Sequence, residues 1–180
     1  MPNVGIVTDS VATIPESFLE ELNIHWVPYY VHRGKEVFRD LVTIDCESFY
    51  RWLPQAKELP TTANPSSADY ENIYEALAKD GMREIVSIHI TSKGSGAYQA
   101  AKIAKNSILE RIPNLKIEVI DFSGMSMCQG WMVIESARAA LAGATYETII
   151  DMVKTMFLIT QVMLLVDSLQ KLHIIRRIGK

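Results

Sequence analysis

Short apolar runs along the chain alternate with longer stretches in which apolar residues recur every three or four positions. The first pattern is typical of buried parallel strands, and the second of helices that pack one face on a core. Strands are predicted over residues 4–8, 25–31, 36–38, 84–90, 116–120 and 158–166. Helices are predicted up to residue 22 and over residues 46–53, 69–79, 97–111, 126–142, 145–156 and 168–172. Because strands and helices alternate, the sequence predicts an α/β fold, a mostly parallel sheet with helices on both faces.

Local signals mark the starts of several helices. Capping-box patterns occupy residues 13–16 and 126–129, where a hydroxyl residue is followed three positions later by Glu or Gln. Asp45 is predicted to cap the helix that follows it, and Ser66 or Ser67 to cap the next one.

The end of the chain is expected to begin a second domain. Residues 158–166 are predicted to form a strand, and Asp167 is predicted to cap a short helix over residues 168–172. We interpret this pair as the first unit of a second α/β domain. The expected organisation is an N-terminal α/β domain over residues 1–157 and the beginning of an incomplete C-terminal domain over residues 158–180.

Composition narrows the classes of partner. The chain has 180 residues, 48% of them hydrophobic, and a mean hydropathy of +0.08, so a sizeable core is available. The formal net charge is −3, which argues against a nucleic-acid partner because such a partner needs a basic face. The histidines and cysteines have no ligand spacing, so no metal is expected.

Cysteine usage and the N-terminus indicate the compartment. Cys46 and Cys128 are far apart and suggest no disulfide framework, which favours a reducing cytoplasm. The N-terminus has no basic segment before its first strand, so no signal peptide is predicted. The most apolar stretch, residues 152–166, is interrupted by Lys154 and by polar residues, so no membrane span is expected.

Residues 89–98 combine a strand end, a small-residue turn and a helix start. Free backbone N–H groups and the positive end of the helix dipole are expected there, together with the hydroxyls of Thr91, Ser92 and Ser95. This combination suits an anionic head group that carries oxygen atoms. On this stretch alone, a plain helix cap by Ser95 is the more frequent explanation.

Polar loops follow three of the predicted strands. The carboxyl ends of parallel strands meet at one edge of a sheet, which is where open α/β sheets bind ligands. Asp9 and Asp121 lie in two of these loops and are interpreted as loop caps, since neither has a predicted partner for acid–base chemistry. His89 ends another of these strands and is expected to be structural.

Four motifs in this order and spacing resemble the DegV family. They are Thr-Asp-Ser at 8–10, Thr-Ala-Asn-Pro-Ser at 62–66, Ser-Gly-Ala-Tyr-Gln-Ala-Ala at 95–101, and Val-Ile-Asp at 119–121 followed by Ser-Met-Cys-Gln-Gly at 126–130. The resemblance covers essentially the whole chain. The family usually has Thr-Ser-Gln-Pro-Ser where this chain has its second motif, a departure that can alter the shape of a pocket.

The resemblance implies a bacterial lipid-binding protein and not an enzyme. Family members hold one long-chain fatty acid, with the tail in an apolar tunnel and the carboxylate bound by hydroxyls. By position in the motifs, these hydroxyls are expected to be Thr62 and Ser95. The implied partners are the fatty acid and the catalytic subunit of a fatty acid kinase. The bound fatty acid is the ligand, and no cofactor is expected.

Flexible apolar side chains suit a tunnel that accepts varied tails, and methionine is the most adaptable of them. The candidate tunnel residues are Ile88, Ile90, Met125, Met127, Met132 and Met163. For any one of them, a place in the ordinary core is the simpler explanation.

The main alternative is a phosphocarrier or a small-molecule kinase, because the predicted fold resembles the mannose-transporter phosphocarrier domain and dihydroxyacetone kinase. Those proteins use a histidine near the sheet edge, whereas the first strand here ends in Asp9 and Ser10. A hydrolase is disfavoured because the chain has no Gly-x-Ser-x-Gly turn. A dinucleotide site is disfavoured because Gly94 and Gly96 lack the third glycine of that motif.

Overall fold

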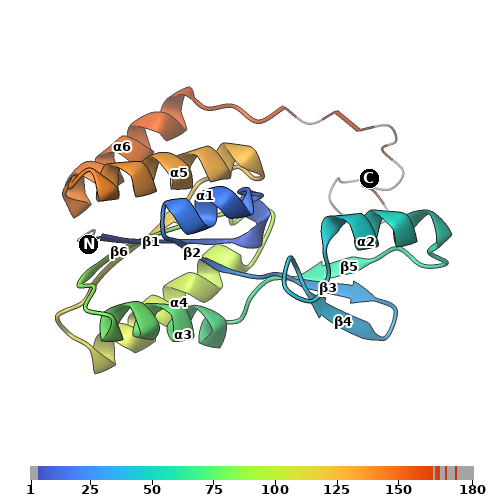
Figure 1. Cartoon of the computed structure of the whole chain (residues 1–180), viewed down its shortest axis with the longest axis horizontal. Helices are drawn as coiled ribbons and strands as arrows, with labels where there is room; N and C mark the ends of the chain where they lie inside the picture. Colours follow the sequence, from blue (N-terminus) through green and yellow to red (C-terminus); the bar gives the residue numbers. More distant parts are fainter. Residues whose placement is uncertain (1–3, 164, 167–168, 170–172, 174–180) are drawn as a thin grey trace.

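A four-stranded parallel sheet forms the centre of the molecule (Figure 1). The computed structural model of the chain describes residues 4–163, 165–166, 169 and 173. In spatial order the strands are β2 (Ile24–Val27), β1 (Val4–Asp9), β6 (Glu84–His89) and β7 (Lys116–Asp121). Every neighbouring pair is parallel, so the four carboxyl ends lie at the same edge.

Helices cover both faces of this sheet (Figure 1). On one face lie α3 (Ser67–Lys79) and α4 (Ala97–Arg111). On the other lie α1 (Glu16–Glu21), α5 (Met127–Leu141) and α6 (Tyr146–Ile159). The α/β class with a parallel sheet and helices on both faces, predicted from the alternating patterns, is confirmed.

Side chains of the central strands alternate between two cores, one beneath each helical layer. In β1, Ile6 packs in the core beneath α5 and α6, whereas Val7 packs in the core beneath α3 and α4. In β6, Val86 packs in the core beneath α5 and α6, and Ile85 packs in the core beneath α3 and α4. Because both faces are buried, these strands appear in the sequence as continuous apolar runs and not as alternating ones.

A smaller antiparallel sheet stands beside the main one (Figure 1). Its strands, in spatial order, are β4 (Glu36–Arg39), β3 (Tyr30–Arg33) and β5 (Thr61–Ala63). α2 (Cys46–Trp52) lies above it and continues into the short helix η2 (Leu53–Gln55). A further short helix, η1 (Ser10–Ala12), follows β1. The return strand predicted over residues 36–38 is confirmed as β4.

Residues 25–31 do not form the single strand that was predicted. They are divided between β2 and β3, which belong to different sheets. Pro28 lies at the break and has no N–H to donate to a sheet. The next N–H group, that of Tyr29, donates to Ser10 Oγ at 3.1 Å. This break carries the chain from the main sheet to the small one.

Two of the predicted helix caps are confirmed. Asp45 accepts a hydrogen bond from the backbone N–H of Ser48 at 2.7 Å and starts α2. Ser66 starts α3, where its side chain and that of Asp69 each accept from the other's backbone N–H. Both caps lie in the local sequence, which is why the pattern reveals them.

The capping boxes predicted at residues 13–16 and 126–129 do not form. Thr13 has a left-handed φ of 50° and ends η1, and α1 begins after Pro15 without a side-chain cap. Ser126 also has a left-handed φ, of 59°, and makes no cap bond to α5. The two hydroxyls lie 3.3 Å apart and bond each other, so a contact between distant segments replaces both local caps.

The strand predicted over residues 158–166 is wrong. α6 continues to Ile159, and residues 160–163 form neither helix nor strand. An apolar run of this length is compatible with either a helix or a strand, and here the helix persists. The cap at Asp167 and the helix predicted over 168–172 lie outside the described residues, and the domain division stays a prediction. Among the described residues, no helix has both the length and the apolarity to cross a lipid bilayer.

Candidate functional site

The carboxyl ends of three strands bring polar residues from distant parts of the sequence to one edge of the main sheet. Asp9 ends β1, His89 ends β6 and Asp121 ends β7. Asp121 caps its own loop, since its Oδ1 accepts from the backbone N–H groups of Ser123 at 2.9 Å and Ser92 at 3.2 Å. Both the gathering at this edge and the role of Asp121 agree with the sequence prediction.

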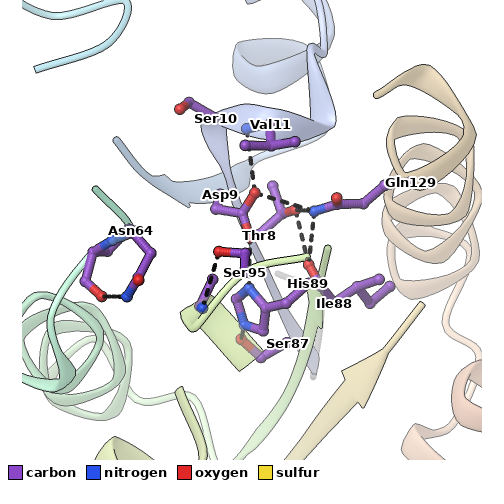
Figure 2. Close-up of polar contacts among 12 residues, drawn as sticks. Thr8, Asp9, Ser10, Val11, Asn64, Ser87, Ile88, His89, Ser95 and Gln129 are labelled. Carbon is purple, nitrogen blue, oxygen red and sulfur yellow. Dashed lines mark hydrogen bonds and ion pairs between the residues drawn. The ribbon is translucent and has the colours of Figure 1, made fainter. Parts of the chain in front are cut away.

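A buried hydrogen-bonded chain begins at Asp9 (Figure 2). Asp9 Oδ2 lies 2.9 Å from His89 Nδ1, and His89 Nε2 lies 2.7 Å from Ser87 Oγ. The hydroxyl of Tyr74 donates to Ser87 Oγ at 2.8 Å, and all four side chains are buried. Ser87 then has its own proton to donate to Nε2, and Nδ1 is the ring nitrogen that donates to Asp9.

Gln129 joins this chain to β1 and β6 from α5 (Figure 2). Its Nε2 donates to Thr8 Oγ1 at 3.0 Å, to Asp9 Oδ1 at 3.3 Å and to the backbone oxygen of Ile88 at 3.3 Å. Gly130 allows α5 to come this close, because a Cβ there would lie 2.6 Å from a backbone oxygen of η1. The helix is therefore fixed to the ends of two strands.

Asp9 has a larger role than the loop cap that was predicted. It does accept from the backbone N–H of Val11 at 3.2 Å, so the cap is confirmed. Its pairing with His89 was not foreseen. The period of two along a strand places Ser87 and His89 on one face of β6, which is a signal in the sequence. That β1 is the neighbour of β6 could not be read from the pattern.

The order Asp9–His89–Ser87 matches the acid, base and nucleophile of many hydrolases. Ser87 is fully buried, however, and burial raises the pKa of Tyr74, so the tyrosine stays protonated and occupies the serine oxygen. Both ring nitrogens of His89 are also engaged, which leaves none to take a phosphoryl group. The network is structural, and neither the hydrolase nor a phosphocarrier acting through His89 fits this geometry.

An apolar cavity of about 770 Å³ lies between α1 and β2 on one side and the small sheet with α2 on the other. This volume falls within the ~300–1,000 Å³ of small-molecule sites. Its apolar lining includes Ile14, Leu19, Ile24, Trp26, Val31, Leu41, Ile44 and Phe49. Its hydroxyl lining includes Ser10, Thr13 and Thr62, and its carboxylates are Glu16, Glu20, Asp40 and Asp45.

The cavity reaches the polar edge of the main sheet. A hollow of about 10 Å³ is lined by Thr8, Asp9 and Ser10, and it shares Ser10, Trp26 and Leu41 with the large cavity. The apolar space therefore adjoins the loop that follows β1. A tail-shaped molecule could place a polar end at this edge and its apolar part beneath α2.

The two predicted head-group residues, Thr62 and Ser95, both contact the segment 29–31, which joins the main sheet to the small one. Thr62 pairs with Val31 across β5 and β3, and both line the cavity. Ser95 is not among the lining residues, and its Oγ lies 2.6 Å from the hydroxyl of Tyr29. Ser95 also accepts from the N–H of Ala97 at 3.3 Å, so the plain capping role considered for it is present as well.

The end of β5 and the start of α4 lie in contact. A Cβ on Gly96 would lie 2.9 Å from Asn64 Oδ1, so the asparagine side chain packs directly against this glycine. The motifs at residues 62–66 and 95–101, which are separate in the sequence, therefore meet in the fold.

The residues predicted to form the tunnel are placed elsewhere. Ile88 and Met132 are fully buried in the core beneath α5, and Met163 is 92% exposed. None of the six candidates lines the cavity. The sequence suggested a tunnel beside β6 and α5, where the main cores are filled, so these residues do not line this cavity. The cavity is formed by the crossing from the main sheet to the small one, which the pattern did not reveal.

Within the described part of the chain, no group of three or more histidine, cysteine or acidic side chains is placed to hold a metal ion. Cys46 is exposed and lines the cavity, and Cys128 is half-buried. Both are free thiols.

The fold and the cavity place this protein among the α/β domains with a parallel sheet and a polar carboxyl edge that adjoins an apolar cavity. A family model described as "Uncharacterised protein, DegV family" matches residues 3–180. The chain belongs to the DegV family, as the motifs in its sequence suggested.

Individual relatives agree with this assignment. A DegV domain-containing protein of Clostridium perfringens is 34% identical over 176 residues, which are 98% of this chain and 62% of that protein. The crystal structure of DegV from Bacillus subtilis, a fatty acid binding protein, matches with a TM-score of 0.79 and 30% identity over 87% of this chain and 54% of that one. A stearic acid-binding protein from Eubacterium ventriosum matches with a TM-score of 0.77 and 28% identity over 84% of this chain and 52% of that one. The chain thus spans about three fifths of the first of these relatives.

Proposed function

We propose that the protein binds one long-chain fatty acid, with the tail in the apolar cavity and the carboxylate held by the hydroxyls of Thr62 and Ser95. The observation that carries this proposal is the cavity itself, which is largely apolar and borders the polar edge of the sheet. Similar proteins of known structure bind fatty acids, which supports the same ligand class for this chain.

The two ends of such a ligand contribute differently to affinity. Each CH₂ group buried in the cavity contributes about 0.8 kcal/mol, so a long tail supplies most of the binding free energy. A carboxylate removed from water is costly unless donors surround it. Hydroxyl donors to a charged group contribute about 1.5–3 kcal/mol each, which makes the head-group contacts decisive for the choice of an acid over a neutral lipid.

The position of Ser95 constrains the bound carboxylate. A carboxylate that contacts both Thr62 and Ser95 has to lie between β5 and the start of α4, beside the contact of Asn64 with Gly96. The N-terminus of a helix stabilises negative charge, and the carboxylate would lie at that end of α4.

We further propose that the protein has no catalytic residues of its own and presents the acid, in the cytoplasm, to the catalytic subunit of a fatty acid kinase. Resemblance to the DegV family supports this partner. The absence of catalytic chemistry is supported by the sheet edge, where Asp9, His89 and Asp121 are all engaged in structural hydrogen bonds.

Thr62→Ala and Ser95→Ala are each expected to weaken the binding of hexadecanoic acid by about 10- to 100-fold, because each removes one donor to the carboxylate. Isothermal titration calorimetry on the 180-residue chain measures this. Thr61→Ala is the control for the first variant, since Thr61 is adjacent in β5 but is not part of the cavity lining. Ser107→Ala, further along the same helix α4, provides the control for the second. Wild-type affinity in both variants would show that the head-group assignment is wrong.

A further inference from the structure

We propose that Ser10 is a further ligand-binding residue, whose hydroxyl donates a hydrogen bond to an oxygen atom of the bound lipid. This inference rests on the proposed function and adds a residue that neither the motifs nor the head-group assignment includes. The oxygen belongs either to the carboxylate or to a hydroxyl or keto group within the tail, and the experiment below separates the two.

The hydrogen-bonding state of Ser10 is the first argument. Its side-chain oxygen accepts from the N–H of Tyr29 at 3.1 Å, and no group in the described part of the chain accepts its proton. Ser10 is only 6% exposed. A buried donor without an acceptor costs about 1–3 kcal/mol, so this hydroxyl is poised to gain from a ligand that brings one.

The position of Ser10 is the second argument. It lines both the large cavity and the hollow at the sheet edge, so its hydroxyl borders the space that a ligand would fill. Neighbouring hydroxyls are already in use. Thr8 donates to the backbone oxygen of Ile88 at 2.9 Å, and the hydroxyl of Thr13 bonds that of Ser126 at 3.3 Å.

The distribution of charged side chains around the cavity also favours a ligand oxygen at the Ser10 end. The carboxylates on its lining include Glu16, Glu20 and Asp45, which are exposed and so border the solvent side. Like charges repel an anionic head group from that side. Asp40 also lines the cavity and Asp9 lines the hollow beside Ser10, but the Asp9 oxygens are already bonded by Val11, His89 and Gln129, and Ser10 adds an available donor at this end.

Tyr29 links this serine to the head-group residues. Its backbone N–H donates to Ser10 Oγ, and its hydroxyl lies 2.6 Å from Ser95 Oγ. Two residues further along, Val31 pairs with Thr62. The short segment between the two sheets therefore positions all three hydroxyls relative to one another.

The test measures the affinity of wild-type protein and Ser10→Ala for octadecanoic acid, its methyl ester and 10-hydroxyoctadecanoic acid by calorimetry. If Ser10 contacts the carboxylate, Ser10→Ala binds the acid about 10-fold or more weakly and loses less affinity for the ester. If it contacts an oxygen in the tail, only the hydroxy acid loses affinity, by about 2- to 10-fold. Ser17→Ala, an exposed serine on α1, is the matched control.

Equal losses for all three lipids, or no loss for any, would overturn the inference, because a purely structural serine does not distinguish ligand oxygens. If Ser10→Ala does not fold, the nearly isosteric Ser10→Cys, with its weak thiol donor, is judged by the same three affinities. A wild-type protein that binds none of the lipids would instead refute the proposed function, and the inference with it.

Discussion

Asp9→Ala is expected to lower the free energy of unfolding by about 3 kcal/mol or more, because it leaves buried donors without an acceptor at about 1–3 kcal/mol each. The Asp9 carboxylate accepts from His89 Nδ1, from the amide of Gln129 and from the N–H of Val11. All three donors lose this acceptor in the variant, and the buried imidazole loses its only acidic partner. Since domains of this size are stable by about 5–15 kcal/mol, the loss is a large fraction of the total.

Urea denaturation followed by circular dichroism measures this loss. Asp121→Ala is the matched control, because Asp121 ends the edge strand β7 and caps a loop through two backbone N–H groups, but it lies outside the buried Asp9–His89 network. About 1 kcal/mol is expected for it, as for other lost caps. Asp9→Asn, which keeps one oxygen acceptor, should lie between the two. If Asp9→Ala loses no more stability than Asp121→Ala does, the buried hydrogen bonds of Asp9 with His89 and Gln129 do not stabilise the fold as proposed.

Phe49→Asp is expected to weaken fatty acid binding by about 100-fold or more, because the new carboxylate would have to be desolvated beside the tail without a partner. Phe49 lines the cavity from α2, where its ring contacts those of Tyr50 and Trp52. It belongs to neither of the two main cores, so the fold should tolerate the change. Calorimetric titration with hexadecanoic acid measures the effect.

Val37→Asp is the control for this variant. Val37 is an exposed residue of β4 in the same small sheet, and it does not line the cavity. The Val37→Asp variant should bind hexadecanoic acid as tightly as the wild type does. Thermal unfolding should show that Val37→Asp and Phe49→Asp are both folded. If the two bind equally well, the tail occupies some other part of the protein.

Features set by local sequence could be predicted, and those set by distant contacts could not. The α/β class, the cap at Asp45 and the capping box at Ser66 follow from spacing within a few residues, and all are observed. The caps predicted at Thr13 and Ser126 fail because these two hydroxyls, 113 positions apart, bond each other. No local pattern contains that contact.

The same division holds for the site. The gathering of polar loops at one edge of the main sheet was predicted, because loops after parallel strands meet at one edge whatever their details. The sequence did not reveal the cavity beneath α2, because this cavity depends on a break at Pro28 that sends the chain into a second sheet. The pairing of Asp9 with His89 likewise depends on which strands are neighbours.

The candidate site consists of a buried hydrogen-bonded network and of hydroxyl groups that line the cavity beside it. The buried bonds of Asp9, His89 and Gln129 hold the ends of β1 and β6 and the start of α5 in place. The neighbouring Ser10 and Thr62 face the cavity with hydroxyls that make no donation to the described part of the chain. Fixing the first group pre-organises the second, which lowers the entropy cost of binding.

The most direct test of the account is mass spectrometry of the lipid extracted from the 180-residue protein after purification from bacterial cells, run in parallel on Phe49→Asp. The account predicts about one long-chain fatty acid per wild-type chain and a strongly reduced amount in the variant. Wild-type protein without fatty acid, or equal amounts in the two proteins, would contradict the claim that the cavity beneath α2 holds the tail.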